Sequence, residues 1–505
     1  MLKAIGLENY KSYKKRTEIN IAPLTVLCGV NSSGKSSILK SLLMLKQSYE
    51  SESTSHSMLF SGDYVDNGSF DDIVFHLNKK EIEKDSNFKI SNTYLIRDTS
   101  DQNGKNLIKR QDIMSFKELK RVFYQTKNIK NVKYFEITVE IEVQRPNYNE
   151  AEFEFYTESN IIKNYNIKLS LLNNKKNLID NVERYIYISK NLSIKETEKN
   201  GWGIKWNGIP PLANNTPQEH ICTCYFSGLQ IKNIYVENMK RDLINTLPNL
   251  LSIFKIVSFQ SDGFNFIAPL REQPMRRYSI NNNVNSVGIS GEKTPILLAR
   301  ESENKKTDCI PPIISNNKVF WETKRLKFKE LVSSWMDYLN LGNITLGGSG
   351  GLVEININNH NIVDVGFGVS QALPIIVQGL YMLKDESLFL EQPEIHLHPE
   401  MQLQMADFLI ALAKNEKNII VETHSDHFVN RIIHRVMQNY SELNDLINIY
   451  IVEKDEQTGC STVRLKEISK YDGTEKDKNK FFFTQYESEI NKIVDIGLSN
   501  MMENL

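Results

Sequence analysis

The stretch that decides the fold is Gly29-Val30-Asn31-Ser32-Ser33-Gly34-Lys35-Ser36, which matches the pattern GxxxxGK[ST] in full. Strand-like apolar residues lead into it from Leu24, and Ile38, Leu42 and Leu45 follow it at helical spacing. The glycines let backbone N–H groups wrap around phosphate groups, and the start of the helix adds the positive end of its dipole. The stretch therefore predicts a phosphate cradle between a strand and a helix, as in α/β nucleotide-binding folds.

Side chains of this loop predict how a nucleotide is held. We expect Lys35 to reach the β- and γ-phosphates of ATP. We expect the Ser36 hydroxyl to bind Mg²⁺, because this hard ion takes oxygen ligands. ATP and Mg²⁺ are thus the predicted cofactors, and the other loop members of the predicted site are Asn31, Ser32, Ser33, Gly34 and Ser37.

A P-loop needs a carboxylate from a second strand, and the sequence offers one. Residues 388–390 form an apolar run that ends at Glu391, and 419–421 form another short apolar run shortly before His424. Ligands of open α/β sheets gather at the carboxyl ends of parallel strands. We therefore expect Glu391 and His424 to lie near Lys35.

Composition limits the class of protein. The 505 residues exceed one simple core, so two or more folding units are expected. No apolar run approaches a membrane-spanning length, and the N-terminus lacks a signal-peptide layout, which predicts a cytoplasmic protein without a membrane partner. A net charge of -1 gives no global attraction to nucleic acid, so DNA binding would need a local basic patch such as 11–16 or 324–329. Five scattered cysteines fit reduced thiols.

Changes in composition divide the chain into four parts. The phosphate cradle lies in the first part, and the second part is rich in Asn, Lys, Ile and Tyr with alternating strand patterns. A parallel-sheet pattern, in which short apolar strands alternate with amphipathic helices, returns in the third part. The predicted parts are an N-terminal head region at 1–80, an insertion at 81–257, a C-terminal head region at 258–440 and a cap at 441–505.

Local patterns predict several elements outside the cradle. Residues 135–143 alternate as a half-buried strand, and 234–254 read as a helix interrupted at Pro248. The glycine run 347–351 predicts a hairpin turn, because no Lys-Ser/Thr follows it as a second phosphate loop would require. A short helix is expected through 490–494.

Four motifs carry a resemblance to a known superfamily. Residues 24–37, 367–371, 388–399 and 421–425 resemble, in this order, the Walker A, signature, Walker B with D-loop, and switch-histidine motifs of ABC-type ATPases. The opening 5–13 resembles the start of RecF, SMC and OLD-like heads. The resemblance implies an α/β fold: an ABC-type P-loop ATPase head with a mixed α/β insertion between its two halves and a small C-terminal cap.

Two of these segments, 366–374 and 391–399, resemble AAA-type ATPases of bacterial defence loci, among them the ATPase subunit of Septu-like anti-phage systems. The resemblance covers both halves of the head but not the insertion. Residues 266–271 are similar to a segment of the same ATPases, and they end in Arg271, to which no role is assigned.

The resemblance also implies roles for single residues in a nucleotide-gated dimer. ATP held by one protomer would be covered by the signature residues of the other, His424 would sense the γ-phosphate, and Glu391 would join the magnesium shell. The signature residues expected to contact ATP are Gly368, Ser370 and Gln371.

This chain departs from the pattern at the catalytic base. The family usually has Asp-Glu where this sequence has Glu391-Gln392. An amide can orient water but cannot accept its proton, and loss of a general base costs a factor of ~10² to 10⁴. Either the ATP-bound dimer is long-lived, or Glu394 supplies the carboxylate. The predicted catalytic set is Gln392, Glu394 and His424.

Three functions remain open at this point. The first is an ATPase that forms a dimer or a higher oligomer on ATP and controls a separately encoded effector, such as a nuclease, in anti-phage defence. The second is an OLD-like nuclease, for which 449–455 resembles an opening strand although no Asp-x-Asp pair follows. The third is a DNA repair or maintenance ATPase, which the missing heptad pattern disfavours. A metal cluster of Glu394, His396 and His398 is a less favoured interpretation than dimer contacts.

Overall fold

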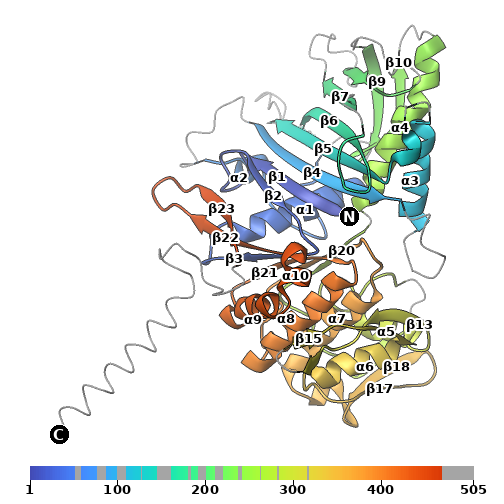
Figure 1. The fold of residues 1–505 in the computed structure, drawn as a ribbon. Coiled ribbons are helices and arrows are strands. Elements are labelled where there is room, and N and C mark those ends of the chain that lie inside the picture. The colour runs from blue at the N-terminus through green and yellow to red at the C-terminus, as the bar shows by residue number, and fades with distance from the viewer. Residues whose placement is uncertain are drawn as a thin grey trace.

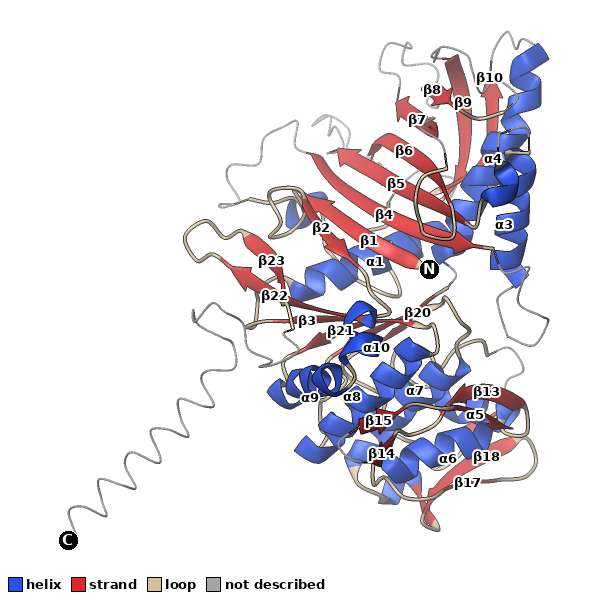
Figure 2. Cartoon of the chain, in the orientation of Figure 1, coloured by secondary structure: helices blue, strands red, loops and turns tan. Residues whose placement is uncertain are grey.

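The computed structural model contains two large sheets (Figure 1). A helix and a hydrophobic core lie between them. Figure 2 shows the two sheets as separate groups of strands, with most helices below the second sheet. The structure describes residues 1–51, 58–76, 87–98, 110–124, 126, 128–144, 161–179, 184–190, 201–210, 220–236, 241–261, 263–280, 284–315 and 318–468.

The first sheet is antiparallel throughout and has the order β10-β9-β8-β7-β6-β5-β4-β1-β2. In β5 every second residue is buried, the pattern of a sheet with one face on a core. Its strands are β1 (Leu2–Glu8), β2 (Thr17–Asn20), β4 (Asn87–Arg97), β5 (Tyr134–Gln144), β6 (Ile161–Leu172), β7 (Arg184–Lys190), β8 (Gly201–Asn207), β9 (His220–Ser227) and β10 (Gln230–Val236).

Three helices share the core of this sheet. α1 (Lys35–Glu50), α3 (Arg110–Val122) and α4 (Arg241–Ser261) contribute buried apolar side chains to one cluster with the sheet, and α3 and α4 lie along its far end in Figure 1. The same cluster includes Leu27, Phe389 and Ile420 of the second sheet. α1 therefore packs between the two sheets.

The second sheet has the order β11-β20-β21-β3-β22-β23, and all neighbours except β22 and β23 are parallel. Its middle strands β3 and β21 are buried along their whole length, as expected for a parallel sheet covered on both faces. Its strands are β3 (Leu24–Cys28), β11 (Phe264–Ile267), β20 (Ser387–Glu391), β21 (Asn418–Thr423), β22 (Ile447–Lys454) and β23 (Ser461–Leu465).

A layer of helices and small sheets covers the other face of the second sheet, and its apolar side chains form a second core cluster. The helices are α5 (Thr294–Glu301), α6 (Phe328–Tyr338), α7 (Phe367–Tyr381), α8 (Pro399–Lys414), α9 (Asp426–Gln438) and α10 (Tyr440–Leu443). The short strands are β12 (Tyr278–Ser279), β13 (Lys305–Cys309), β14 (Ile313–Ser315), β15 (Lys318–Phe320), β16 (Thr323–Lys327), β17 (Ile344–Gly347), β18 (Leu352–Ile357) and β19 (His360–Asn361). The remaining short turns are α2 (Phe70–Ile73) and three 3₁₀ helices, η1 (Ile129–Asn131), η2 (Ile362–Asp364) and η3 (Asn444–Leu446).

None of the described helices is long and apolar enough to cross a membrane.

Several sequence predictions are confirmed by these elements. The apolar run before Gly29 is β3, the helix after it is α1, and residues 135–143 lie in β5. The glycine run 347–351 joins β17 to β18 in an antiparallel hairpin, as predicted. The predicted fold class, an α/β P-loop head, is confirmed by a parallel sheet with the P-loop between β3 and α1.

Two local predictions are wrong. Residues 234–236 belong to β10, and the helix begins only at Arg241 and continues through Pro248. Edge pairing with β9 overrides the local helical pattern. The interval 268–386 is also not a run of parallel strands, because β12 to β19 pair antiparallel in small sheets. The helix predicted at 490–494 lies outside the described residues.

The three boundaries between the predicted parts stay predictions, but the sheets cross two of them. Strands β1 and β2 share one sheet with β4 to β10 of the predicted insertion. Strand β22 of the predicted cap pairs with β3 inside the second sheet. The described parts of the insertion and the cap are thus continuous with the head.

Candidate functional site

The loop between β3 and α1 has a backbone that only small residues permit. Gly29 has φ 147°, and a Cβ there would lie 2.2 Å from the carbonyl oxygen of Val452. Gly34 has φ 108°, and its Cβ would lie 2.6 Å from Ser12 Oγ and 2.7 Å from Ser461 Oγ. Both positive φ values favour glycine. The two invariant positions of the GxxxxGK[ST] pattern are therefore required by the geometry of this chain.

Two hydroxyl groups from distant parts of the chain hold the loop. Tyr13 donates its hydroxyl hydrogen to Gly34 O at 3.0 Å, and Ser461 donates to Ser33 O at 2.5 Å. Ser461 opens β23, and its own backbone N–H donates to Ser12 O at 2.7 Å. The hairpin of β22 and β23 thus braces the loop from the side opposite to α1.

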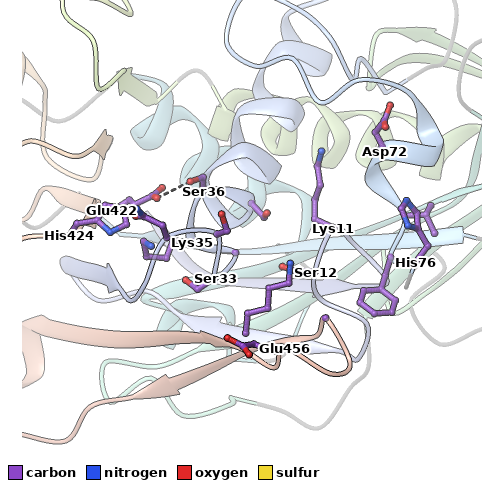
Figure 3. Close-up of a pocket in the computed structure, with 18 of the residues that line it drawn as sticks. Lys11, Ser12, Ser33, Lys35, Ser36, Asp72, His76, Glu422, His424 and Glu456 are labelled. Atoms are coloured by element: carbon purple, nitrogen blue, oxygen red, sulfur yellow. Dashed lines mark hydrogen bonds between the residues drawn. The ribbon is translucent and has the colours of Figure 1, made fainter. Parts of the chain in front are cut away.

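Lys35 and Ser36, the predicted phosphate and metal residues, point into one pocket with Glu422 and His424 (Figure 3). The Lys35 ammonium donates to Gly29 O at 2.9 Å and to Val30 O at 2.8 Å. Burial lowers the pKa of Lys35, and the nearby Glu422 carboxylate opposes that shift. Ser36 Oγ donates to Glu422 Oε1 at 2.8 Å, an interaction that joins α1 to the end of β21.

Two carboxylates lie side by side at the strand ends. Glu391 of β20 and Glu422 of β21 are register partners in parallel strands, so their side chains leave the same face of the sheet. That face is the one covered by α1, because Phe389 and Ile420, each two residues earlier, pack in the α1 core cluster. Burial, followed by the charge of Glu422, raises the pKa of Glu391 to about 7. Burial also raises the pKa of Glu422, although Ser36 and Lys35 favour its ionised form.

Gln392 lies at a bend directly after β20. Its φ of 46° places a residue other than glycine in the left-handed region, which costs about 1–3 kcal/mol and persists only where the surroundings enforce it. Its backbone N–H donates to Glu422 O at 2.8 Å. Gln392 lines the same pocket as the P-loop, so the amide predicted at the catalytic-base position reaches the site.

Glu394 links the bend after β20 to the bend after β21. Its Oε1 accepts a hydrogen bond from the His424 backbone N–H at 2.8 Å, and the side chain is buried. Burial raises the pKa of Glu394. The Glu394 carboxylate is therefore held against the backbone at His424, whereas Gln392 lines the pocket.

His424 lies next to the P-loop, where burial and the positive charge of Lys35 lower the pKa of its imidazole. Ser425 caps α9 by accepting from Phe428 N at 3.0 Å, which fixes the chain directly after the histidine. A neutral imidazole is the form that these surroundings favour at pH 7.

The pocket encloses about 810 Å³, which is the size of a site for a nucleotide-sized ligand. The lining also includes residues to which the sequence motifs assign no role, among them Lys11, Ser12, Asp72, His76, Lys454 and Glu456. From the sequence, Lys11 is only part of the basic patch 11–16. These residues come from three separate segments of the chain, so only the fold identifies them as parts of one site.

The signature residues lie elsewhere. Gly368, Ser370 and Gln371 stand at the start of α7, and none of them lines this pocket. Phe367 is 44% exposed, and its ring packs edge-on against His396 with centroids 5.0 Å apart. A Cβ at Gly368 would meet nothing closer than His396 O at 3.6 Å. Gly366 and Phe367 are thus exposed at the start of α7, whereas the predicted signature residues Ser370 and Gln371 are buried.

The donor atoms of the pocket suit a magnesium nucleotide. Ser36 Oγ and the Glu422 carboxylate are hard oxygen donors, which Mg²⁺ prefers. The predicted ligand Glu391 is the register neighbour of Glu422 but does not line the pocket. Glu422 Oε2 is buried without a hydrogen-bond partner among the described residues, so one carboxylate oxygen remains available. The start of α1 and Lys35 supply the positive potential that phosphates need. The residues present therefore fit the predicted ATP and Mg²⁺.

A parallel sheet, a P-loop and strand-end carboxylates together define a P-loop ATPase. The family comparison agrees: the model of the AAA ATPase domain matches residues 1–429. The chain belongs to this AAA ATPase family. A search of curated protein sequences finds no match.

Solved structures that resemble the chain include three heads of SMC proteins. The SMC head domain from Thermotoga maritima is 11% identical over 92% of this chain and 99% of its own, with a TM-score of 0.38. An SMC head bound to the C-terminal winged-helix domain of ScpA is 12% identical over 93% and 98%, with a TM-score of 0.40. An SMC head with an extended coiled coil, bound to the C-terminal domain of ScpA derived from Pyrococcus furiosus, is 12% identical over 92% and 96%, with a TM-score of 0.36.

Proposed function

We propose that this ATPase binds Mg-ATP between two protomers, hydrolyses it slowly, and uses the ATP-bound dimer to control a separate effector protein. The observation that carries the proposal is the 2.8 Å hydrogen bond from Ser36 Oγ to Glu422, which brings the phosphate loop and the strand-end carboxylates to one point. The partly exposed Gly368, with open space beside it, supports a contact from the start of α7 to a neighbouring protomer.

Each residue has a distinct part in the proposed mechanism. The Lys35 ammonium exchanges its contacts with Gly29 O and Val30 O for phosphate oxygens. Ser36, Glu391 and Glu422 would hold Mg²⁺, which would supply positive charge to neutralise the phosphates. Gln392 orients the attacking water. The other members of the proposed ATP site are Asn31, Ser32, Ser33, Gly34 and Ser37 on the same protomer and Gly368, Ser370 and Gln371 on its partner.

The switch segment completes the mechanism. We assign His424 to the γ-phosphate, because it lies beside Lys35 and its neutral imidazole can donate one hydrogen bond there. Glu394 keeps His424 in place by accepting from its backbone N–H. Slow hydrolysis follows from Gln392, since an amide cannot take the proton of the attacking water.

Dimerisation is tested by measuring molar mass with light scattering, with and without Mg-ATP. The wild-type mass should double with ATP. Lys35→Ala should lose both nucleotide binding and the dimer, whereas Gly368→Glu should keep nucleotide binding by the monomer and lose the dimer, because its charge would face the γ-phosphate of the partner site. A Cβ at position 368 meets no atom closer than 3.6 Å, so this variant should fold.

The control is Lys329→Ala, which removes an exposed lysine of α6 that pairs with Glu303. It should behave as the wild type. An ATP-dependent dimer of the Gly368→Glu variant would show that the start of α7 does not cover the nucleotide.

The effector and its setting rest on the resemblance to ATPases of defence loci. We propose a separately encoded nuclease as the effector and phage as the target. Co-expression with the neighbouring gene should lower the efficiency of phage plating, and Lys35→Ala should restore it. DNA cleavage by the purified chain alone would favour the OLD-like nuclease instead, and stimulation of hydrolysis by DNA ends would favour a repair or maintenance ATPase.

A further inference from the structure

Arg271 is a buried cation that the mechanism above does not use. It follows β11, the edge strand that pairs with β20, so it arrives beside the residues that follow β20. Arg271 is 5% exposed, although the preceding Leu270 is 74% exposed. Burial of a charged side chain is costly unless hydrogen bonds or a charge partner compensate it, so its contacts identify its role.

Both ends of the guanidinium face the backbone at Gln392. Nη1 donates to Gln392 O at 3.3 Å, and Nη2 donates to Glu391 O at 3.4 Å. Two successive carbonyl groups are thus held by one rigid fork, a geometry that lysine cannot reproduce. The buried carboxylate of Glu394 is the nearby negative charge.

These contacts act on a residue in an unfavourable conformation. Gln392 has φ 46°, and its N–H donates to Glu422 O at 2.8 Å. The residue is therefore held by β21 on its amide side and by Arg271 on its carbonyl side. A strained conformation persists only where the surroundings enforce it. Without the guanidinium, the bend could relax and carry the Gln392 side chain away from the pocket.

We infer that Arg271 is a positioning residue for hydrolysis: it fixes the left-handed bend at Gln392 so that the Gln392 side chain reaches the nucleotide. The inference rests on the proposed function, in which Gln392 orients the attacking water. Arg271 itself does not line the pocket, so it acts through Gln392 and not on the phosphates. Nucleotide affinity should consequently be insensitive to it.

The first test compares Arg271→Met with the wild type in single-turnover hydrolysis and in Mg-ATP binding. Hydrolysis should slow by about 10- to 100-fold, because small displacements of a catalytic group have effects of this size. The Kd for Mg-ATP should change by less than about 2-fold, because Arg271 does not line the pocket. The control is Arg277→Met, an exposed arginine paired with Glu354, which should change neither quantity.

A second readout needs no nucleotide. Hydrogen exchange of a peptide covering 391–394 should be faster in Arg271→Met than in the wild type, because the N–H of Gln392 would lose its fixed geometry. Exchange in β5 of the first sheet should not change. Arg271→Lys keeps the charge but not the fork, so it should resemble Arg271→Met in both readouts, and it replaces the methionine variant if that variant does not fold.

A double mutant separates positioning from a purely structural role. In a Gln392→Gly background the side chain is absent and φ 46° carries no strain, so adding Arg271→Met should slow hydrolysis no further. Equal slowing in both backgrounds, unchanged hydrolysis in Arg271→Met, or a parallel loss of nucleotide binding and thermal stability would each overturn the inference. A wild-type chain that does not hydrolyse ATP would defeat the proposed function before any Arg271 variant is compared.

Discussion

Buried acidic side chains lie in two regions of this molecule, and their surroundings differ. Asp407, in the helical layer, is fully buried and accepts hydrogen bonds from Tyr338 at 2.6 Å, from Arg431 at 2.7 Å and from Arg435 at 2.7 Å. Burial favours its neutral form, but the hydrogen bonds from Arg435 and Arg431 outweigh it and lower the pKa of Asp407. Its charge is therefore compensated within the chain.

For the carboxylates near the P-loop, burial outweighs the interactions that favour the ionised form. Glu391, Glu394 and Glu422 all have a raised pKa with burial as the first cause. Glu394 Oε2 and Glu422 Oε2 are buried without a hydrogen-bond partner in the part of the chain that the structure describes. Charges left uncompensated in a pocket are characteristic of sites that a ligand completes. The network in the helical layer is complete, whereas Glu422, the one of these three carboxylates that lines the pocket, keeps an oxygen that a cation can bind.

The largest effect is expected from Gln392→Glu, which adds a carboxylate beside those of Glu391, Glu394 and Glu422. It should accelerate hydrolysis by ~10²-fold or more, because a general base replaces an amide that only orients water. Steady-state hydrolysis with Mg-ATP measures the effect. Gln438→Glu, the same change in the helical layer, should leave the rate unaltered. An unchanged or slower rate in Gln392→Glu would remove position 392 from the chemical step.

The complete network in the helical layer is tested by Asp407→Asn. This change leaves the buried Arg435 without its carboxylate, and breaking a buried pair costs about 3–5 kcal/mol. The free energy of unfolding, measured with urea, should fall by that amount. Glu442→Gln, which breaks the exposed pair with Lys414 in the same layer, should cost less than about 1 kcal/mol. Similar losses in both variants would mean that Asp407 is not specially compensated.

The sequence predicts the phosphate loop well because its signal is local. The glycines at 29 and 34, the preceding strand and the following helix all lie within about one βα unit, and each is where the pattern predicts it. The placement of Gln392 and His424 in the pocket follows from a similar rule, because both come directly after parallel strands. Such predictions need only the order of elements along the chain.

Contacts between distant segments could not be predicted in this way. Glu422 precedes the predicted His424 by two residues, yet its bond to Ser36 depends on β21 being the neighbour of β3. Likewise, the brace from Ser461 requires β22 to enter the sheet beside β3. The misread segment 234–236 has the same cause, since pairing with β9 determines its state. Strand order decides all three, and no local pattern encodes it.

The smallest effect is expected from Glu391→Gln, which removes one of the carboxylates near the P-loop. The pKa of Glu391 is about 7 in the folded chain and its ordinary value is 4.5, so the folded state keeps a proton that the unfolded state releases between these values. The wild type therefore loses stability as pH rises through this window, and the glutamine variant does not. Without nucleotide or Mg²⁺, the variant should match the wild type near the lower value and exceed it by ~3 kcal/mol at alkaline pH. Urea unfolding at the two ends of the window measures this, with Glu442→Gln as the control. An equal difference at both ends would show that the carboxylate is compensated after all, like Asp407, and the contrast between the two regions would fail at that residue.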